Sequence, residues 1–251
     1  MYIYFFMQKT VYLFDLDGTL CESTKKITET MLTELKKCDC ELGIVGGGTF
    51  HKIVSQLQNS TLFKYLFCEN GCVNYIRSDN NSYSLIHKNS IRDHPIYELY
   101  VQHLLKLSLK FIAEQDFKIC GGLIDVRDGL IYISLPGIQS TQKERDEFLE
   151  LDKKNNYREK LYKLLTKEID DKKMENISVN FGGATGVNIY PTEWDKSQVI
   201  KYFNNYIVHY FGDKYDIGGN DYKLINHTDV IGHKVNSPDD TLKILNTLNI
   251  H

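Results

Sequence analysis

The chain has 251 residues and a formal net charge of −3, with 42% of its residues hydrophobic and 25% charged. This composition is typical of a folded protein with a substantial core, and it excludes disorder, collagen and low complexity. Because 30 basic residues stand against 33 acidic ones, the charge does not indicate a clamp for phosphate backbones, and we expect no nucleic-acid partner.

The longest apolar runs, such as Tyr2 to Met7, are far shorter than the ~18 residues that span a bilayer. No basic segment precedes this run, so we expect a soluble protein with no membrane partner, whose translation starts at Met1 or at Met7. The six cysteines form no C-x-x-C pair and have no histidine at a zinc-ligand spacing, and we interpret them as reduced.

The first third of the chain alternates short apolar runs with helical spacing. Thr10 to Asp15 predicts a strand, and apolar residues from Ile27 to Leu35 repeat at the spacing of a helix. Leu42 to Val45 and Tyr65 to Cys68 predict two further strands, with a helical stretch between them after three glycines. This order predicts an α/β fold with a parallel, Rossmann-like sheet.

After about residue 85 the pattern changes. A helix-like stretch from Tyr97 to Ile112 leads into two apolar runs separated by Asp128-Gly129, a pair typical of a tight antiparallel hairpin. A long charged segment then precedes two more strand-like runs, and helix and strand alternate again from Trp194 onward. We therefore expect one domain built from residues 1–85 and 189–251, interrupted by an α+β insertion at 86–188.

Acidic residues follow the first predicted strand in the motif D-x-D-G-T, from Asp15 to Thr19. Because alternate strand residues share a face, we expect the carboxylates of Asp15 and Asp17 to point beyond the carboxyl edge of the sheet. Two clustered acids favour a hard cation such as Mg²⁺. Asp213, after another apolar run, could supply the remaining ligand, and Lys196 would add the positive charge that phosphoryl transfer needs.

Together these residues predict phosphoryl transfer through an aspartyl phosphate. An Asp-Gly pair after a strand is also common turn chemistry, and Asp213 alone could be an acidic turn residue. The position of the motif at a first strand, with Lys196 and Asp213 downstream in order, favours a functional site.

In these residues the chain resembles the eukaryotic phosphomannomutases of the haloacid dehalogenase superfamily, over nearly its whole length. The resemblance also rests on blocks in the same order and at similar spacing: Val45-Gly46-Gly47, Glu69-Asn70-Gly71, Arg127-Asp128-Gly129, Glu144-Arg145, Glu150 to Lys154, Trp194-Asp195-Lys196, Phe211 to Lys214 and Gly218 to Asp221. It implies a haloacid dehalogenase core with a mobile inserted cap. It further implies Asp15 as nucleophile, Asp17 as general acid and base, and Asp213 as magnesium ligand, with the Asp17 backbone carbonyl as a further metal contact.

The resemblance also implies a cap that binds the distal phosphate of a sugar through arginines, a serine and an aspartate. Arg127 and Arg145 match two of these arginines, and we expect both to bind substrate. Gly186 stands in the position of the serine and Asn188 in that of the aspartate.

Other substrate positions depart further from the family. Thr24 and Ile138 stand where the family has arginine, which leaves open whether mannose or glucose phosphates are preferred. His227 stands where an acid is usual in the family's second cation loop, so we carry no second metal site over.

The resemblance therefore implies a magnesium-dependent mutase that interconverts mannose 6-phosphate and mannose 1-phosphate, primed by a bound hexose 1,6-bisphosphate. It suggests a cytoplasmic homodimer joined through its caps and supplying GDP-mannose synthesis. Two alternatives stay open: a sugar-phosphate phosphatase, in which water attacks the aspartyl phosphate, and a non-catalytic relative that only binds phosphosugars or a partner. The second is disfavoured because Asp15, Asp17, Lys196 and Asp213 are all present.

Overall fold

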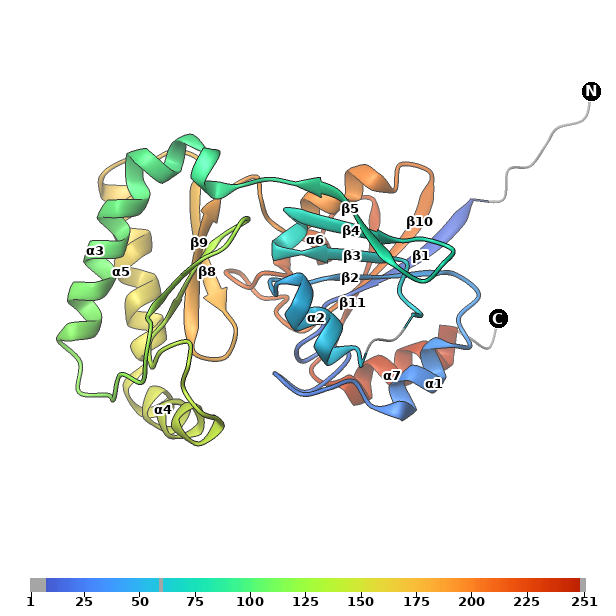
Figure 1. The fold of residues 1–251 in the computed structure, drawn as a ribbon, viewed down its shortest axis with the longest axis horizontal. Coiled ribbons are helices and arrows are strands. Elements are labelled where there is room, and N and C mark those ends of the chain that lie inside the picture. The colour runs from blue at the N-terminus through green and yellow to red at the C-terminus, as the bar shows by residue number, and fades with distance from the viewer. Residues whose placement is uncertain (1–7, 59–60, 249–251) are drawn as a thin grey trace, which may run out of the picture. The chain divides into compact units, whose positions relative to one another are not determined.

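The computed structural model describes residues 8–58 and 61–248, so the apolar run from Tyr2 to Met7 lies outside the described residues. The chain forms two compact units (Figure 1). The core unit contains the chain up to Ile86, Lys196–Asp216 and the segment from Asp221 onward, and the cap unit contains His87–Asp195 and Ile217–Asn220. Within the described residues, no helix combines the length and the apolar content needed to cross a bilayer.

The core unit is built on a seven-stranded sheet in the order β11-β10-β1-β2-β3-β4-β5. Neighbouring strands from β11 to β3 are parallel, and β4 is antiparallel to β3. The strands are β1 (Lys9–Phe14), β2 (Glu41–Val45), β3 (Tyr65–Cys68), β4 (Val73–Arg77), β5 (Tyr83–Lys88), β10 (Tyr206–Gly212) and β11 (Val230–Lys234). The predicted parallel sheet is confirmed, and the sheet places the carboxyl ends of β1 and β10 side by side.

Two core helices begin at a side-chain cap. Thr28 accepts a hydrogen bond from the backbone nitrogen of Met31, 3.2 Å away, at the start of α1 (Glu29–Leu35). At the start of the last helix, α7 (Pro238–Leu248), Ser237 accepts from the Asp240 nitrogen at 3.3 Å. The remaining core helices are α2 (Phe50–Gln56) and α6 (Tyr222–Ile225), with 3₁₀ segments at Glu69–Gly71 and Lys196–Tyr202.

The cap unit has a four-stranded antiparallel sheet in the order β6-β7-β9-β8. Its strands are β6 (Ile124–Val126), β7 (Ile131–Ser134), β8 (Ile177–Gly182) and β9 (Gly186–Pro191). The predicted hairpin around Asp128-Gly129 is confirmed by the pairing of β6 with β7. The domain boundary expected after residue 188 falls within β9, whereas the chain leaves the cap unit after Asp195.

The cap helices are α3 (Gln102–Ala113), α4 (Gln142–Asn155) and α5 (Tyr157–Asp171), and a 3₁₀ turn at Ile91–Asp93 and a π-helical turn at Tyr97–Val101 precede α3. A capping box between Thr141 and Glu144 starts α4. Asn156 ends α4 with a left-handed backbone, φ 54°. The long charged segment is therefore two helices separated by a single turn residue.

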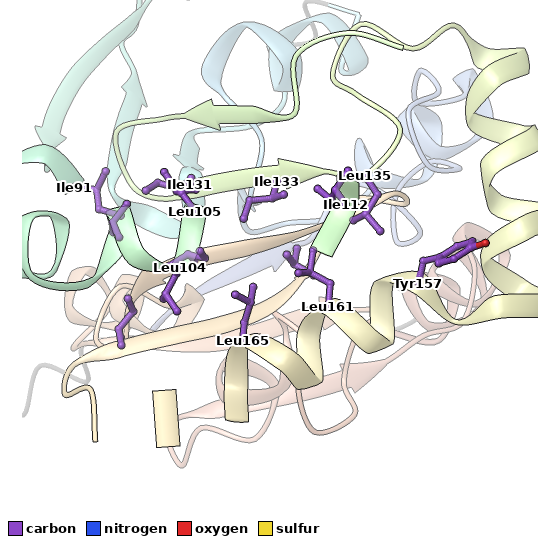
Figure 2. Packing of buried hydrophobic residues seen from close by; sticks show 14 of the residues in the cluster. Ile91, Leu104, Leu105, Ile112, Ile131, Ile133, Leu135, Tyr157, Leu161 and Leu165 are labelled. Carbon is purple, nitrogen blue, oxygen red and sulfur yellow. The ribbon is translucent and has the colours of Figure 1, made fainter. Parts of the chain in front are cut away.

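The core of the cap unit lies between its sheet and its helices. Figure 2 shows Ile131 and Ile133 of β7 facing leucines of α3 and α5, among them Leu104 and Leu161. Because strand residues alternate between faces, Tyr132 lies on the opposite face of the sheet from these isoleucines. That opposite face carries a row of polar residues, paired strand to strand: Asp125, Tyr132, Asn188 and Asn180.

Candidate active site

Asp15 follows β1 directly, at the carboxyl edge of the core sheet. Its backbone nitrogen donates to Phe211 O at 2.9 Å, which fixes the end of β1 against β10. Its carboxylate is buried and accepts a hydrogen bond from Lys196 Nζ at 2.6 Å. Burial raises the pKa of Asp15 to about 7, and the charge of Lys196 opposes that rise.

Lys196 has no exposed side-chain surface and lies between two carboxylates. Its Nζ is 2.6 Å from Asp15 Oδ1 and 2.6 Å from Asp221 Oδ1. Burial alone would lower the pKa of Lys196, but the two carboxylates raise it above its usual value. The predicted cation is thus present beside Asp15 and stays charged.

Asp221 is a site residue to which we assigned no role from the sequence. Besides Lys196, it accepts hydrogen bonds from the Tyr210 hydroxyl and from the Lys214 backbone nitrogen, the latter at 2.9 Å. Burial alone would raise the pKa of Asp221, but Lys196 and these donors hold it below its usual value. Asp221 and Lys196 are 25 residues apart, and only the fold brings them together.

Three carboxylates meet at this edge of the sheet. Oxygens of Asp15, Asp213 and Asp221 lie within 4.8 Å of one another. Burial raises the pKa of Asp213, and its Oδ1 is buried without a hydrogen-bond partner among the described residues. Because Mg²⁺ prefers oxygen ligands and an unsatisfied buried carboxylate needs a positive partner, the cluster suits magnesium.

Gly18 allows the nucleophile loop to approach this cluster. It has φ +90°, a conformation that other residues rarely adopt. A Cβ at this position would lie 2.7 Å from the Asp213 carboxyl carbon. A glycine is therefore required where the D-x-D-G-T motif contacts the end of β10.

The Asp17 carboxylate has its own set of donors and is not part of the three-carboxylate cluster. It accepts hydrogen bonds from Thr24 N at 2.8 Å, Lys52 Nζ at 2.7 Å and Gln56 Nε2 at 2.7 Å. Burial would raise its pKa, but Lys52 and these hydrogen bonds lower it. No motif in the sequence indicates Lys52 or Gln56, which reach Asp17 from α2.

The two candidate phosphate-binding arginines of the cap unit each have protein partners. Arg127 Nε donates to Asp125 Oδ2 at 2.7 Å, and its guanidinium lies 5.1 Å from the centre of the Tyr132 ring. Arg145, in the first turn of α4, donates to the backbone oxygens of Ser140 at 3.1 Å and Ile138 at 3.2 Å. Arg145 therefore also braces the loop before its helix.

Gly186 and Asn188 both lie on β9. Asn188 is buried and donates to Asn180 Oδ1 at 3.0 Å across the sheet. A Cβ at Gly186 would meet the backbone oxygen of Ile133 and would lie 2.6 Å from Cε2 of Tyr132, so the strand backbone and the tyrosine ring together fill the space that a side chain at 186 would need.

The combination of a parallel core sheet, acidic residues at its strand ends and an inserted α+β unit is that of the haloacid dehalogenase fold. The chain superimposes on IMP-nucleotidase of Plasmodium falciparum with a TM-score of 0.65 at 15% identity, covering 97% of this chain and 68% of that one. It also superimposes on the C-terminal domain of trehalose-6-phosphate phosphatase from C. albicans, with a TM-score of 0.60 at 16% identity, covering 96% and 92% of the two chains. At these identities the likeness concerns the fold.

Sequence comparison defines the family. Residues 28–250 match the family described as eukaryotic phosphomannomutase. A phosphomannomutase of Dendrobium officinale is 36% identical over 242 residues, 94% of this chain and 92% of its own length. One from Spinacia oleracea is 34% identical over 238 residues, 92% of each chain. The chain belongs to the eukaryotic phosphomannomutase family, which confirms the resemblance found in its motifs.

Proposed function

We propose that this protein is a phosphomannomutase that interconverts mannose 6-phosphate and mannose 1-phosphate. The observation that carries the proposal is the buried Asp15–Lys196–Asp221 network beside Asp213, in a chain of this family. A buried carboxylate that a buried lysine holds in place, as Lys196 holds Asp15, is suited to act as a nucleophile.

Asp15 attacks the phosphorus of a sugar phosphate, and the bond between phosphorus and the sugar oxygen breaks. The phosphoryl group is then an aspartyl phosphate on Asp15, and the sugar leaves as an alcohol once its oxygen is protonated. Lys196 favours this step because its charge opposes the rise in the pKa of Asp15 and offsets the negative charge of the phosphoryl oxygens.

Asp17 is the proposed general acid and base. Ionised at the start, it takes a proton from the hydroxyl that attacks the aspartyl phosphate, and it gives that proton to the sugar oxygen that departs when Asp15 is phosphorylated again. To do so, its carboxylate exchanges the hydrogen bond from Lys52, a partly exposed side chain, for one with the sugar hydroxyl.

Asp15, Asp213 and the backbone carbonyl of Asp17 are the proposed magnesium ligands. When bound, the ion would add positive charge beside the transferring phosphoryl group. Asp213 Oδ1, which lacks a hydrogen-bond partner in the part of the chain that the structure describes, supports this assignment. Asp221 already accepts hydrogen bonds from Lys196, Tyr210 and Lys214.

On the cap unit, Arg127 and Arg145 are the proposed ligands of the phosphate that is not being transferred, with Gly186 and Asn188 beside the sugar. A hexose 1,6-bisphosphate would then prime the enzyme, since it carries a phosphate for each site. In keeping with its family, we further propose a cytoplasmic homodimer formed through the cap units that supplies GDP-mannose synthesis.

Phosphorus NMR tests the function directly. The protein is mixed with mannose 1-phosphate, magnesium and a trace of hexose 1,6-bisphosphate, and we expect the mannose 6-phosphate signal to grow. Inorganic phosphate as the only product would show a phosphatase instead, and an unchanged spectrum would show a non-catalytic relative.

A further inference from the structure

Tyr132 lies at the centre of the candidate substrate residues of the cap unit. The Arg127 guanidinium is 5.1 Å from its ring centre, and Asn188 is its partner in the register of β7 with β9. Its Cε2 lies 2.6 Å from where a Cβ of Gly186 would be. Three of the four expected substrate positions thus surround one residue to which the sequence comparison assigned no role.

Asp125 and Tyr132 both contact the Arg127 side chain. Asp125, the register partner of Tyr132 on β6, accepts from Nε at 2.7 Å, and the Tyr132 ring supports the planar group. An arginine side chain has many rotamers, and each fixed contact removes some of them before a ligand arrives. Both contacts limit the orientations that the guanidinium can adopt.

Tyr132 is itself held in place. Its hydroxyl is 3.1 Å from Thr185 Oγ1, in the turn between β8 and β9. The neighbouring position 186 is glycine, and a Cβ there would meet both the Ile133 backbone oxygen and this ring. The glycine at 186 therefore leaves room for the strand backbone and for the ring that contacts Arg127.

We propose that Tyr132 is a positioning residue that holds Arg127 for the phosphate group of the sugar substrate. A guanidinium binds two phosphate oxygens with two parallel hydrogen bonds, so its plane must be set correctly. The ring sets that plane, and the hydroxyl only anchors the ring. This inference rests on the proposed role of Arg127 as a phosphate ligand.

A double-mutant cycle tests the inference. Binding of mannose 6-phosphate is measured by calorimetry without magnesium, so that bound sugar is not turned over, for wild type, Tyr132→Ala, Arg127→Ala and the double variant. Tyr132→Phe keeps the ring and removes the hydroxyl. Tyr97→Ala is the matched control, because the Tyr97 ring lies 5.5 Å from the Arg92 guanidinium in the same unit, away from the candidate site. Circular dichroism verifies that each variant is folded.

We expect Tyr132→Ala to weaken binding by about tenfold and Tyr132→Phe by about twofold or less, because the ring carries the effect. The double variant should bind as weakly as Arg127→Ala alone, and Tyr97→Ala should bind like wild type. Additive losses in the double variant, or equal losses in Tyr132→Phe and Tyr132→Ala, would overturn the inference, as would an equal loss in Tyr97→Ala.

These binding measurements, together with the phosphorus NMR assay on wild type with magnesium, separate this inference from the proposed function. If wild type binds mannose 6-phosphate and isomerises it while the two losses are additive, the inference is wrong and the function stands. If wild type binds the sugar phosphate but releases only inorganic phosphate, the mutase proposal is wrong and the cycle still decides the role of Tyr132. If wild type binds no hexose phosphate, both are wrong.

Discussion

Replacement of Asp221 by asparagine tests whether the buried Lys196 network stabilises the core unit. Asp221 accepts hydrogen bonds from Lys196, from Tyr210 and from the backbone nitrogen of Lys214, and its side chain is 0% exposed. The asparagine has nearly the same shape but carries no charge, and one of its two terminal atoms is a donor. No rotamer can therefore satisfy all three donors at once.

The expected cost follows from these contacts. Breaking a buried ion pair by removing one partner costs about 3–5 kcal/mol, because the remaining charge loses its compensation. Lys196 keeps Asp15 as a second carboxylate, at 2.6 Å, which places the cost at the lower end. We expect the free energy of unfolding to fall by about 3 kcal/mol, a large share of the 5–15 kcal/mol that is usual for a folded domain.

Urea unfolding followed by circular dichroism measures this difference, with equal m values required for the comparison. Asp229→Asn is the control, since that aspartate belongs to the same unit and its side chain is 74% exposed. It should change the free energy of unfolding by less than about 0.5 kcal/mol. A loss below about 1 kcal/mol in Asp221→Asn would show that Asp221 does not sustain the buried charge of Lys196.

Three further predictions concern the core unit. Asp15→Asn should abolish both turnover and the trapped phosphoenzyme, since an amide is not an anionic nucleophile; a labelled phosphoenzyme in this variant would contradict the assignment. Asp213→Ala should raise the magnesium concentration for half-maximal turnover about tenfold or more, and a wild-type titration would count against Asp213 as a ligand. Burial lowers the pKa of His233 to about 4 and also lowers that of His209. As the pH falls, these histidines are therefore protonated in the unfolded chain at a higher pH than in the folded one. The free energy of unfolding should then fall by about 1–2 kcal/mol from pH 6.5 to pH 4, less than the full shift implies because the rings are partly exposed; the same profile in His233→Gln would refute this.

In the core unit, the strands that the sequence predicted are those whose side chains are mostly buried. In β1, four consecutive residues are buried, and such a run is apolar for that reason. In β5 no residue is buried, and β11 contains a glycine, a histidine and a lysine in five residues. Strands at a sheet edge bury less surface, so their sequences carry little of the pattern that identifies a strand.

The candidate site residues that could be predicted were likewise those next to a strand with an apolar pattern. Asp15 and Asp213 could be found because each stands at the end of an apolar strand, where parallel sheets place their functional residues. The contacts of Lys52, Gln56 and Asp221 could not be predicted, because each joins residues that are far apart in the sequence. Lys52 and Gln56 lie 35 and 39 residues from Asp17, and Asp221 lies 25 residues from Lys196. No spacing along the chain predicts such a contact; it exists only after the helices have packed on the sheet.

The cap unit shows what a residue-by-residue comparison leaves out. Gly186 stands where the family has a serine, and considered alone this replacement would remove one hydrogen bond to the substrate. In the structure, a Cβ at 186 would meet the Ile133 backbone oxygen as well as the Tyr132 ring, so a side chain there requires the strand backbone to move. Since that ring also contacts Arg127, such a movement would reach the residue that we propose as the phosphate ligand. Under the proposed function, substrate preference therefore depends on how Tyr132, Gly186 and the neighbouring strand fit together.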